Sequence, residues 1–244
     1  MISHFSVIMR TQDEMKEKLN GYQMYGCLMS MLKEETAEWL HENSRSPISQ
    51  HIIYDKNSFQ WEINLFDEIL SYEIGEVLSD TKEFHAQKAG IDLYIDSVKH
   101  EELKDFSDIR KQSIQLMKSG NTEIYFRTTT ALKKDGEFLL FPDMELILKN
   151  WWNTWNSIFP NNPFDDEDAL RLILKNTYIQ SYRLSSSKHR MKGNNIKGFY
   201  GNMTIGNRLS EPMRELLNAL LVMSEYSGTG VKTALGMGKT TIIK

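Results

Sequence analysis

Cysteine and long apolar runs are the scarcest features of this chain. Its single cysteine, Cys27, excludes an internal disulfide and a metal site built from CxxC pairs, and it favours a reducing compartment. No run of about 18 apolar residues occurs, so no helical membrane span is expected. The N-terminal stretch MISHFSVIMRTQDEM lacks the basic and apolar segments of a signal peptide. We therefore expect a cytoplasmic protein that makes no contact with a membrane.

Acidic residues are missing from one long stretch. Residues 169–210 contain none, although Lys and Arg occur there eight times. Residues 67–108 show the opposite, with twelve acidic residues and four lysines. The net charge of −4 alone argues against a nucleic-acid-binding protein, but a basic zone inside an acidic chain is typical of a polyanion site. A solvated face of a strand pair is the alternative, and we favour the polyanion.

The hydrophobic pattern predicts one order of elements twice. In the first half, alternation predicts strands at residues 4–10, 52–54, 59–65 and 91–98, and helical spacing predicts helices at residues 12–41 and 67–78. In the second half, strands are expected at residues 122–130, 178–184, 196–205 and 240–244, with helices after Asp143, at residues 165–174 and after Ser210. Two successive βαββαβ units predict an α+β protein of two tandem ferredoxin-like domains.

A polar joint near residues 111–121 separates the two halves. We therefore expect an N-terminal ferredoxin-like domain at residues 1–115 and a C-terminal one at residues 116–244. The second contains the basic connector SSSKHRMKGNN between two strands and a glycine-rich segment before the last strand. With 40% hydrophobic residues, the composition can supply a core for both.

The tail GMGKTT is not an ATP-binding P-loop. That motif needs a glycine five residues before its Gly-Lys-Thr, where this chain has Thr233. It also needs a helix after the lysine to direct amide groups at the phosphates. Too few residues follow Lys239 for such a helix, and they are typical of a short strand.

Four glycines before the last strand are spaced as G-x-G-x₅-G-x-G. They are Gly228, Gly230, Gly236 and Gly238. Glycine permits positive φ and close backbone approach, so amide groups of this loop can face a phosphate while Lys232 supplies charge. A helix C-cap would explain one pair of glycines but not the spaced double pair.

On these residues the chain resembles the glycine-rich loop of the CRISPR repeat-associated RAMP superfamily, and within it the family of CRISPR precursor-RNA processing endoribonucleases. The stretches LHENSRSPIS, FRTTTALKKDGEFLLFPD and IKGFYGNMTI also resemble that family. Its members are tandem ferredoxin-like proteins of about this length. The resemblance implies an enzyme that cleaves the repeat in precursor transcripts and releases guide RNAs, without a metal or another cofactor.

The resemblance also implies a catalytic histidine near the end of the first helix, which corresponds to His41. Some members pair it with a tyrosine and a cation; the tyrosine would be Tyr25, with Tyr22 as an alternative, and the nearest cation is Arg45. A helix C-terminus favours the imidazolium form, which can protonate a leaving oxygen. Attack by the ribose 2′-OH would then leave a 2′,3′-cyclic phosphate and a 5′-hydroxyl. His51 is the alternative acid or base, and a surface histidine that caps helix carbonyls is the structural alternative for His41.

Candidate RNA-binding residues lie in the second half of the chain. They are Lys188, Arg190, Lys192, Lys197, Arg208, Gly228, Gly230, Lys232, Gly236 and Gly238. A turn at residues 193–195 would present the connector's cations together to a phosphate backbone. The implied partner is CRISPR precursor RNA, with transient association with a CRISPR effector complex and a monomer or homodimer in solution.

Two other functions stay open at this point. A RAMP protein can bind guide RNA in an effector complex without cleaving it, and an unrelated ferredoxin-like module can bind a small anionic ligand. Retention of RNA in moderate salt separates the RNA-binding functions from the last one. Cleavage of a cognate repeat separates the enzyme from the binding subunit.

Overall fold

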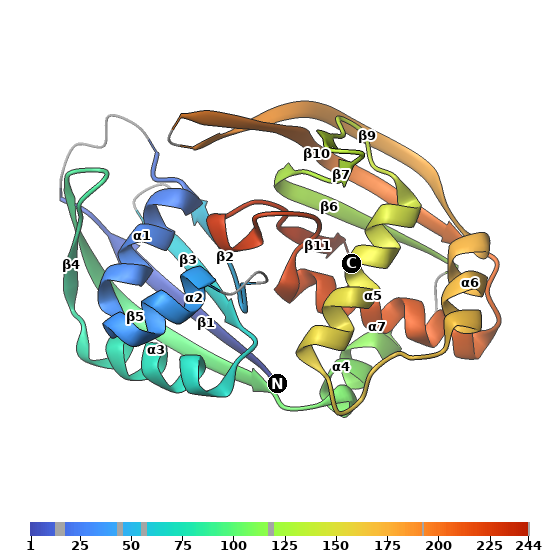
Figure 1. Cartoon of the computed structure of the whole chain (residues 1–244), viewed down its shortest axis with the longest axis horizontal. Coiled ribbons are helices and arrows are strands. Elements are labelled where there is room, and N and C mark those ends of the chain that lie inside the picture. The colour runs from blue at the N-terminus through green and yellow to red at the C-terminus, as the bar shows by residue number, and fades with distance from the viewer. Residues whose placement is uncertain (13–17, 43–45, 55–57, 117–119, 192, 244) are drawn as a thin grey trace. The chain divides into compact units, whose positions relative to one another are not determined.

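The computed structural model describes residues 1–12, 18–42, 46–54, 58–116, 120–191 and 193–243 (Figure 1). Its contacts divide the chain into two compact units. The first unit is Met1–Glu102 with Ala234–Gly236, and the second is Leu103–Thr233 with Met237–Lys244. We use the name glycine-rich loop for residues 228–238. The tip of this loop, residues 234–236, therefore belongs to the first unit by its contacts. The division into domains after residue 115 stays a prediction.

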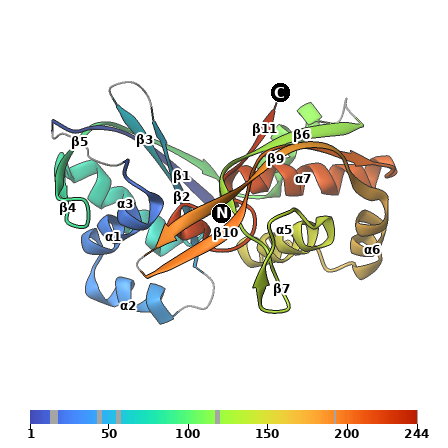
Figure 2. The ribbon, with the colours of Figure 1, turned by 90° about the horizontal axis from the view of Figure 1, so that it is seen from above.

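The first unit contains a five-stranded sheet in the order β2-β3-β1-β5-β4. The strands are β1 (Ile2–Arg10), β2 (Ile48–Tyr54), β3 (Phe59–Leu65), β4 (Glu83–Ala86) and β5 (Ile91–Leu103), and the helices are α1 (Gly21–Met31), α2 (Glu34–Glu42) and α3 (Glu68–Asp80). Without β4, this is the predicted βαββαβ order. The helices lie on one face of the sheet (Figure 2), where alternate residues of β1 and β3 build the core; Phe5, for example, pairs with Ile63.

The helix predicted at residues 12–41 is wrong in its extent, because the chain forms two helices there. Helix α1 begins after Asn20, whose side chain forms a capping box with Gln23. The helix is interrupted between Met31 and Glu34, where the backbone amide of Lys33 donates to the Glu73 carboxylate at 2.7 Å. A partner from α3 thus replaces a helical hydrogen bond. This long-range contact is invisible in the local pattern.

The second unit contains a four-stranded sheet in the order β11-β6-β10-β9. Its strands are β6 (Asn121–Thr130), β9 (Thr177–Met191), β10 (Asn194–Asn207) and β11 (Thr240–Ile243). The helices are α4 (Phe106–Ser113), α5 (Met144–Ile158), α6 (Glu167–Asn176) and α7 (Glu211–Ser227). Short elements complete the unit: η1 (Ile114–Leu116), η2 (Thr233–Leu235) and a hairpin of β7 (Lys133–Lys134) with β8 (Glu137–Phe138). The strand order matches that of the first unit, which confirms the tandem ferredoxin-like prediction.

Two features of this unit differ from the prediction. Helix α4 occupies part of the polar joint; Asp105 caps it by accepting from the Ser107 amide at 2.8 Å, and Arg110 forms an ion pair with Glu215 of α7. The basic connector is not a loop. Strand β9 runs on to Met191 because β10 pairs with it residue by residue, and this pairing outweighs the low strand propensity of serine and lysine.

No helix in the described ranges is long and apolar enough to cross a membrane.

Candidate functional site

A two-stranded basic ribbon extends from the second sheet. We use this name for residues 185–191 of β9 and 194–200 of β10, which pair antiparallel. Lys188, Arg190 and Lys197 are exposed on it, whereas Lys192 lies outside the described residues. Asn194 and Asn195, which were predicted in the turn, belong to β10. The ribbon thus carries three of the four connector cations that were predicted to lie together in a hairpin.

Lys188 and Lys197 occupy directly opposite positions on the two strands. Like charges at such positions repel each other and weaken the pairing. Neither ammonium has a carboxylate partner among the residues that the structure describes. A cross-strand pair of lysines without a counter-charge is typical of a surface that an anion neutralises.

The other face of the ribbon packs against the glycine-rich loop. Ile196, which is buried, forms a small apolar cluster with Ala131 and Met237, and Met191 and Val231 lie against it. Successive residues of a strand point to opposite faces, so this packing leaves Lys197 on the outer face. His189 is opposite Ile196 in the register, and burial lowers its pKa. We therefore expect a neutral imidazole there, which weakens the idea that His189 holds a phosphate by charge.

The backbone amides of the glycine-rich loop are mostly used inside the protein. Those of residues 228–231, 237 and 238 donate to Ser224, Gly238, Asn150, Ala131, Lys232 and Thr129, respectively, at 2.8–3.3 Å. These six amides therefore do not face a phosphate, contrary to the expectation, which stays a prediction for the amides of residues 232–236. Contact of the loop glycines with RNA stays a prediction.

The glycines are needed for close backbone packing. All four have positive φ. A Cβ on Gly230 would overlap the carbonyl oxygen of Ala131, and one on Gly236 would lie 2.7 Å from the Cα of Gly21. Thr229 anchors the loop further: it is fully buried, and its hydroxyl accepts from the Trp151 indole at 2.9 Å. The glycines are thus explained by the backbone conformation and close packing of the loop.

Lys232 lies at the exposed side of this loop in a strained conformation. Its φ is 61°, in a region that side chains with a Cβ rarely adopt. Its ammonium has no acidic partner within the described part of the chain. Strain at an exposed cation indicates that function, rather than stability, keeps this residue in place.

The substitution Lys232→Gly should separate stability from binding. Glycine adopts positive φ without the clash of a Cβ, so the free energy of unfolding should stay equal or rise by up to about 1 kcal/mol. RNA binding should weaken, because an exposed positive charge is lost. Thermal unfolding and RNA titrations at equal salt measure the two effects. Lower stability with full affinity would contradict this role.

His41 lies in the last turn of α2 and is exposed. The predicted helix at residues 12–41 is interrupted, so His41 lies at the end of the separate helix α2. This helix carries four glutamates and no Lys or Arg. A positive field for a phosphate beside His41 must therefore come from other segments. Arg45, predicted for this purpose, lies outside the described residues.

Tyr25 is half-buried on α1 and packs against the core of the first unit. Burial raises the pKa of its hydroxyl, which therefore stays protonated at neutral pH and can donate a hydrogen bond. The alternative, Tyr22, carries the ammonium of Lys88 4.0 Å from its ring centroid. Tyr25 stays the predicted partner of His41, with Tyr22 as the alternative.

His51 does not fit the role of a substitute acid or base. Its side chain is 2% exposed in β2, and its Nε2 lies 3.0 Å from a carboxylate oxygen of Glu62 on the adjacent strand. A substrate phosphate cannot reach it in this position. Burial and the contact with Glu62 give His51 a structural role.

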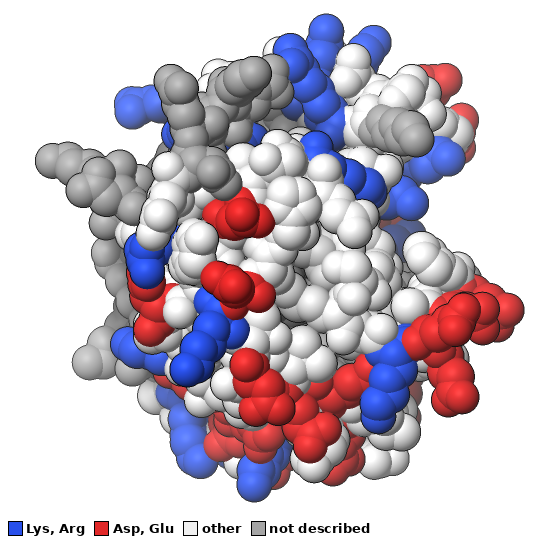
Figure 3. All heavy atoms as spheres, turned by 90° about the vertical axis from the view of Figure 1, so that its left-hand side faces the viewer, with Lys and Arg blue, Asp and Glu red and all other residues white. Residues whose placement is uncertain are grey.

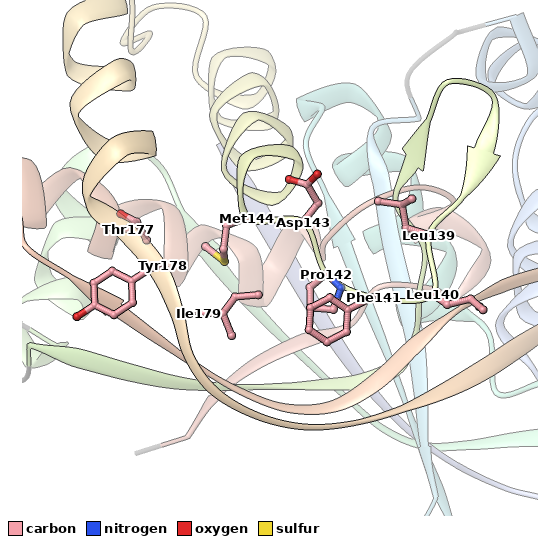
Figure 4. Close-up of a pocket in the computed structure, with 9 residues that line it drawn as sticks. All are labelled: Leu139, Leu140, Phe141, Pro142, Asp143, Met144, Thr177, Tyr178 and Ile179. Carbon is pink, nitrogen blue, oxygen red and sulfur yellow. The ribbon is translucent and has the colours of Figure 1, made fainter.

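Other surfaces are poor sites for RNA. A groove of about 680 Å³ lies between residues 139–144 and the start of β9 (Figure 4), but Asp143 is the one charged residue among the described residues that line it. Helix α3 exposes Glu68, Glu76 and Asp80 and contains no cation. Carboxylates gather along the lower part of the face shown in Figure 3.

Arg208, a predicted RNA-binding residue, is exposed, and its guanidinium lies 5.6 Å from the ring centroid of Tyr178. The described residues contain no group of three His, Cys, Asp or Glu that could hold a metal ion.

Comparison with known proteins bears on this arrangement. A family model described as CRISPR-associated endoribonuclease Cas6 matches residues 124–240, which include most of β6, the ribbon and the glycine-rich loop. The CRISPR-associated endoribonuclease Cas6 of Streptococcus thermophilus is 28% identical over 216 residues, 88% of this chain and 87% of that protein. The chain is thus similar to CRISPR-associated endoribonucleases Cas6 over most of its length. This confirms the resemblance noted in the sequence.

Further Cas6 proteins are similar to the chain in sequence or in fold. The Mycobacterium tuberculosis Cas6 is 24% identical over 89% of this chain and 70% of its own length. Among solved structures, a Cas6 product complex has a TM-score of 0.82 at 18% identity and covers 100% of both chains. Thermus thermophilus Cas6 has a TM-score of 0.72 at 18% identity, covering 100% of this chain and 98% of that one. At these identities, the solved structures establish the shared fold.

Proposed function

We propose that this protein is an endoribonuclease that cleaves the repeat RNA of CRISPR precursor transcripts and releases guide RNAs. The match of almost its whole length to named endoribonucleases carries this proposal. The unneutralised lysines of the basic ribbon supply the contact that a polyanionic substrate needs. Hand-over of the product to a CRISPR effector complex, a cytoplasmic location and a monomer or homodimer complete the proposal.

The chemistry uses a nucleophile that RNA carries. The 2′-oxygen forms a bond to the adjacent phosphorus as its proton leaves, and the bond from phosphorus to the 5′-oxygen breaks as that oxygen gains a proton. The products are a 2′,3′-cyclic phosphate and a 5′-hydroxyl. Alignment of the attacking oxygen can supply much of the rate, because intramolecular attack has a high effective molarity.

His41 is the proposed acid or base in this reaction. Histidine titrates near neutrality, and an exposed imidazole at the end of α2 is accessible to RNA. The protonated hydroxyl of Tyr25 would donate a hydrogen bond to the reacting groups. Arg45 and Lys232 are the proposed sources of positive charge for the phosphorane.

The test is cleavage of RNA that carries the repeat of the source organism. Cleavage should proceed in EDTA and yield the cyclic phosphate, and a 2′-deoxy nucleotide just upstream of the cut should abolish it. Gel analysis with end-group chemistry measures all three results. Binding without cleavage would support the alternative, a guide-RNA-binding RAMP subunit. A strict requirement for magnesium would exclude the proposed chemistry.

A further inference from the structure

A single buried amide connects three elements of the first unit. Gln50 of β2 is 1% exposed, and its Nε2 donates both to the carbonyl oxygen of Gly21, at 2.6 Å, and to that of Ala234, at 2.8 Å. Its Oε1 accepts from the indole of Trp61 at 2.9 Å. Gln50 thus joins the first residue of α1 to the tip of the glycine-rich loop and to the core.

The same two segments touch through their backbones. A Cβ on Gly21 would lie 2.5 Å from the carbonyl oxygen of Leu235 and closer still to the Cα of Gly236. Real Cβ atoms do not approach other atoms so closely, so only glycine fits at residue 21 while the loop tip is in this place. Gly21 does not need positive φ, which leaves this packing as the reason for a glycine there.

We propose that Gln50 and Gly21 are positioning residues for RNA cleavage: they hold the tip of the glycine-rich loop on the start of α1. Helix α1 carries Tyr25 one turn further on. Neither residue contacts RNA. Both act through the loop tip, which belongs to the first unit, and its place sets where RNA bound to the tip lies relative to Tyr25. This inference rests on the proposed function.

A glutamine side chain fits this geometry, whereas a side chain of similar length without an amide does not. It supplies two N–H donors for two carbonyl oxygens and one acceptor for an indole, and all three are satisfied. Methionine keeps the length of the side chain but has no donor. The carbonyl oxygens of Gly21 and Ala234 would then lose their buried partner, which favours release of the loop tip.

The first experiment compares Gly21→Ala with Gly26→Ala on the same helix. Alanine favours a helix over glycine at both positions, so neither change should weaken α1 itself. A Cβ on Gly26 meets the flexible end of Lys88 at 3.3 Å, whereas one on Gly21 displaces the loop tip. Gly21→Ala should lower the single-turnover rate at saturating RNA by roughly 10- to 100-fold, because small displacements of aligned groups cost rate. Gly26→Ala should cleave at the wild-type rate.

The second experiment compares Gln50→Met with Trp61→Phe. Trp61→Phe removes the hydrogen bond from the indole to Gln50, and Gln50→Met removes all three hydrogen bonds of Gln50. Both variants should have a lower melting temperature, but only Gln50→Met should release the loop tip. Gln50→Met should slow cleavage as Gly21→Ala does, and Trp61→Phe should not. Because both changes act through one contact, the double variant Gly21→Ala/Gln50→Met should be hardly slower than either single variant. If the rate reductions of the two single variants multiply in the double variant, the two residues do not act through one contact.

Hydrogen exchange of the free protein keeps this proposal separate from the proposed function. The backbone amides of residues 235–237 should exchange faster in Gly21→Ala and Gln50→Met than in wild type. In the control variants Gly26→Ala and Trp61→Phe, these amides should exchange at the wild-type rate. Folded variants with unchanged exchange would overturn the proposal even if wild type does not cleave RNA. Faster exchange with a wild-type cleavage rate would also overturn it, since the loop tip would then be held for stability alone.

Discussion

Replacing His41 by alanine should slow cleavage of bound repeat RNA by about 10²- to 10⁴-fold, the usual contribution of a general acid or base. Affinity for RNA should stay at the wild-type value, because the change removes one exposed side chain from a helix that otherwise carries glutamates. Single-turnover rates at saturating RNA measure the first effect, and equilibrium titration measures the second. A variant that cleaves at the wild-type rate would refute the role of His41.

The matched control is His85→Ala. His85 is also exposed in the first unit, but it pairs with Asp92 at 2.7 Å in an acidic segment, so its loss should not change the rate. A substrate with sulfur in place of the 5′-oxygen at the cut tests the direction of proton transfer. A thiolate leaves without protonation, so this substrate should restore the rate of His41→Ala if His41 is the acid. A defect that sulfur does not repair would assign His41 the role of base.

Neutralising Lys188, Arg190 and Lys197 should produce the second large effect, on affinity. If each contacts one phosphate, the slope of log K against log salt should fall by about 2 to 3. That slope corresponds to an affinity loss of about 100-fold near 0.15 M salt, which should shrink towards 1 M. Equilibrium titrations over a salt series measure both. An unchanged slope would show that RNA binds elsewhere.

A control with equal charge separates local contact from overall charge. Lys111, Lys149 and Arg171 each pair with a carboxylate in the second unit, and neutralising all three changes the net charge by the same amount. This control should leave the salt slope almost unchanged. The single change Lys197→Glu adds a direct test of the repulsion, because it places a carboxylate opposite Lys188. It should raise the melting temperature while weakening RNA binding.

Much of the fold follows from local patterns in the sequence. The alternation in β1 and β3 and the caps at Asp67, Asp143 and Asp166 are local properties, and the structure contains the corresponding elements. Their order gives two ferredoxin-like units, because such strands and helices have few ways to bury their apolar faces. The absence of acidic residues from the stretch 169–210 is likewise a local property, and it correctly indicates where the basic ribbon lies.

The tertiary structure decides what depends on partners distant in sequence. The break between α1 and α2 depends on Glu73, and the length of β9 depends on its pairing with β10. The glycine spacing drew attention to the loop, but only the structure shows that its amides are used internally and that Gly236 packs against Gly21. Gln50 carries no local signal at all, since its three hydrogen bonds reach residues up to 184 positions away. The sequence by itself shows which reactive side chains are present and which periodic patterns predict helices and strands. The contacts that position these side chains form only in the folded protein, because they join residues distant in the sequence.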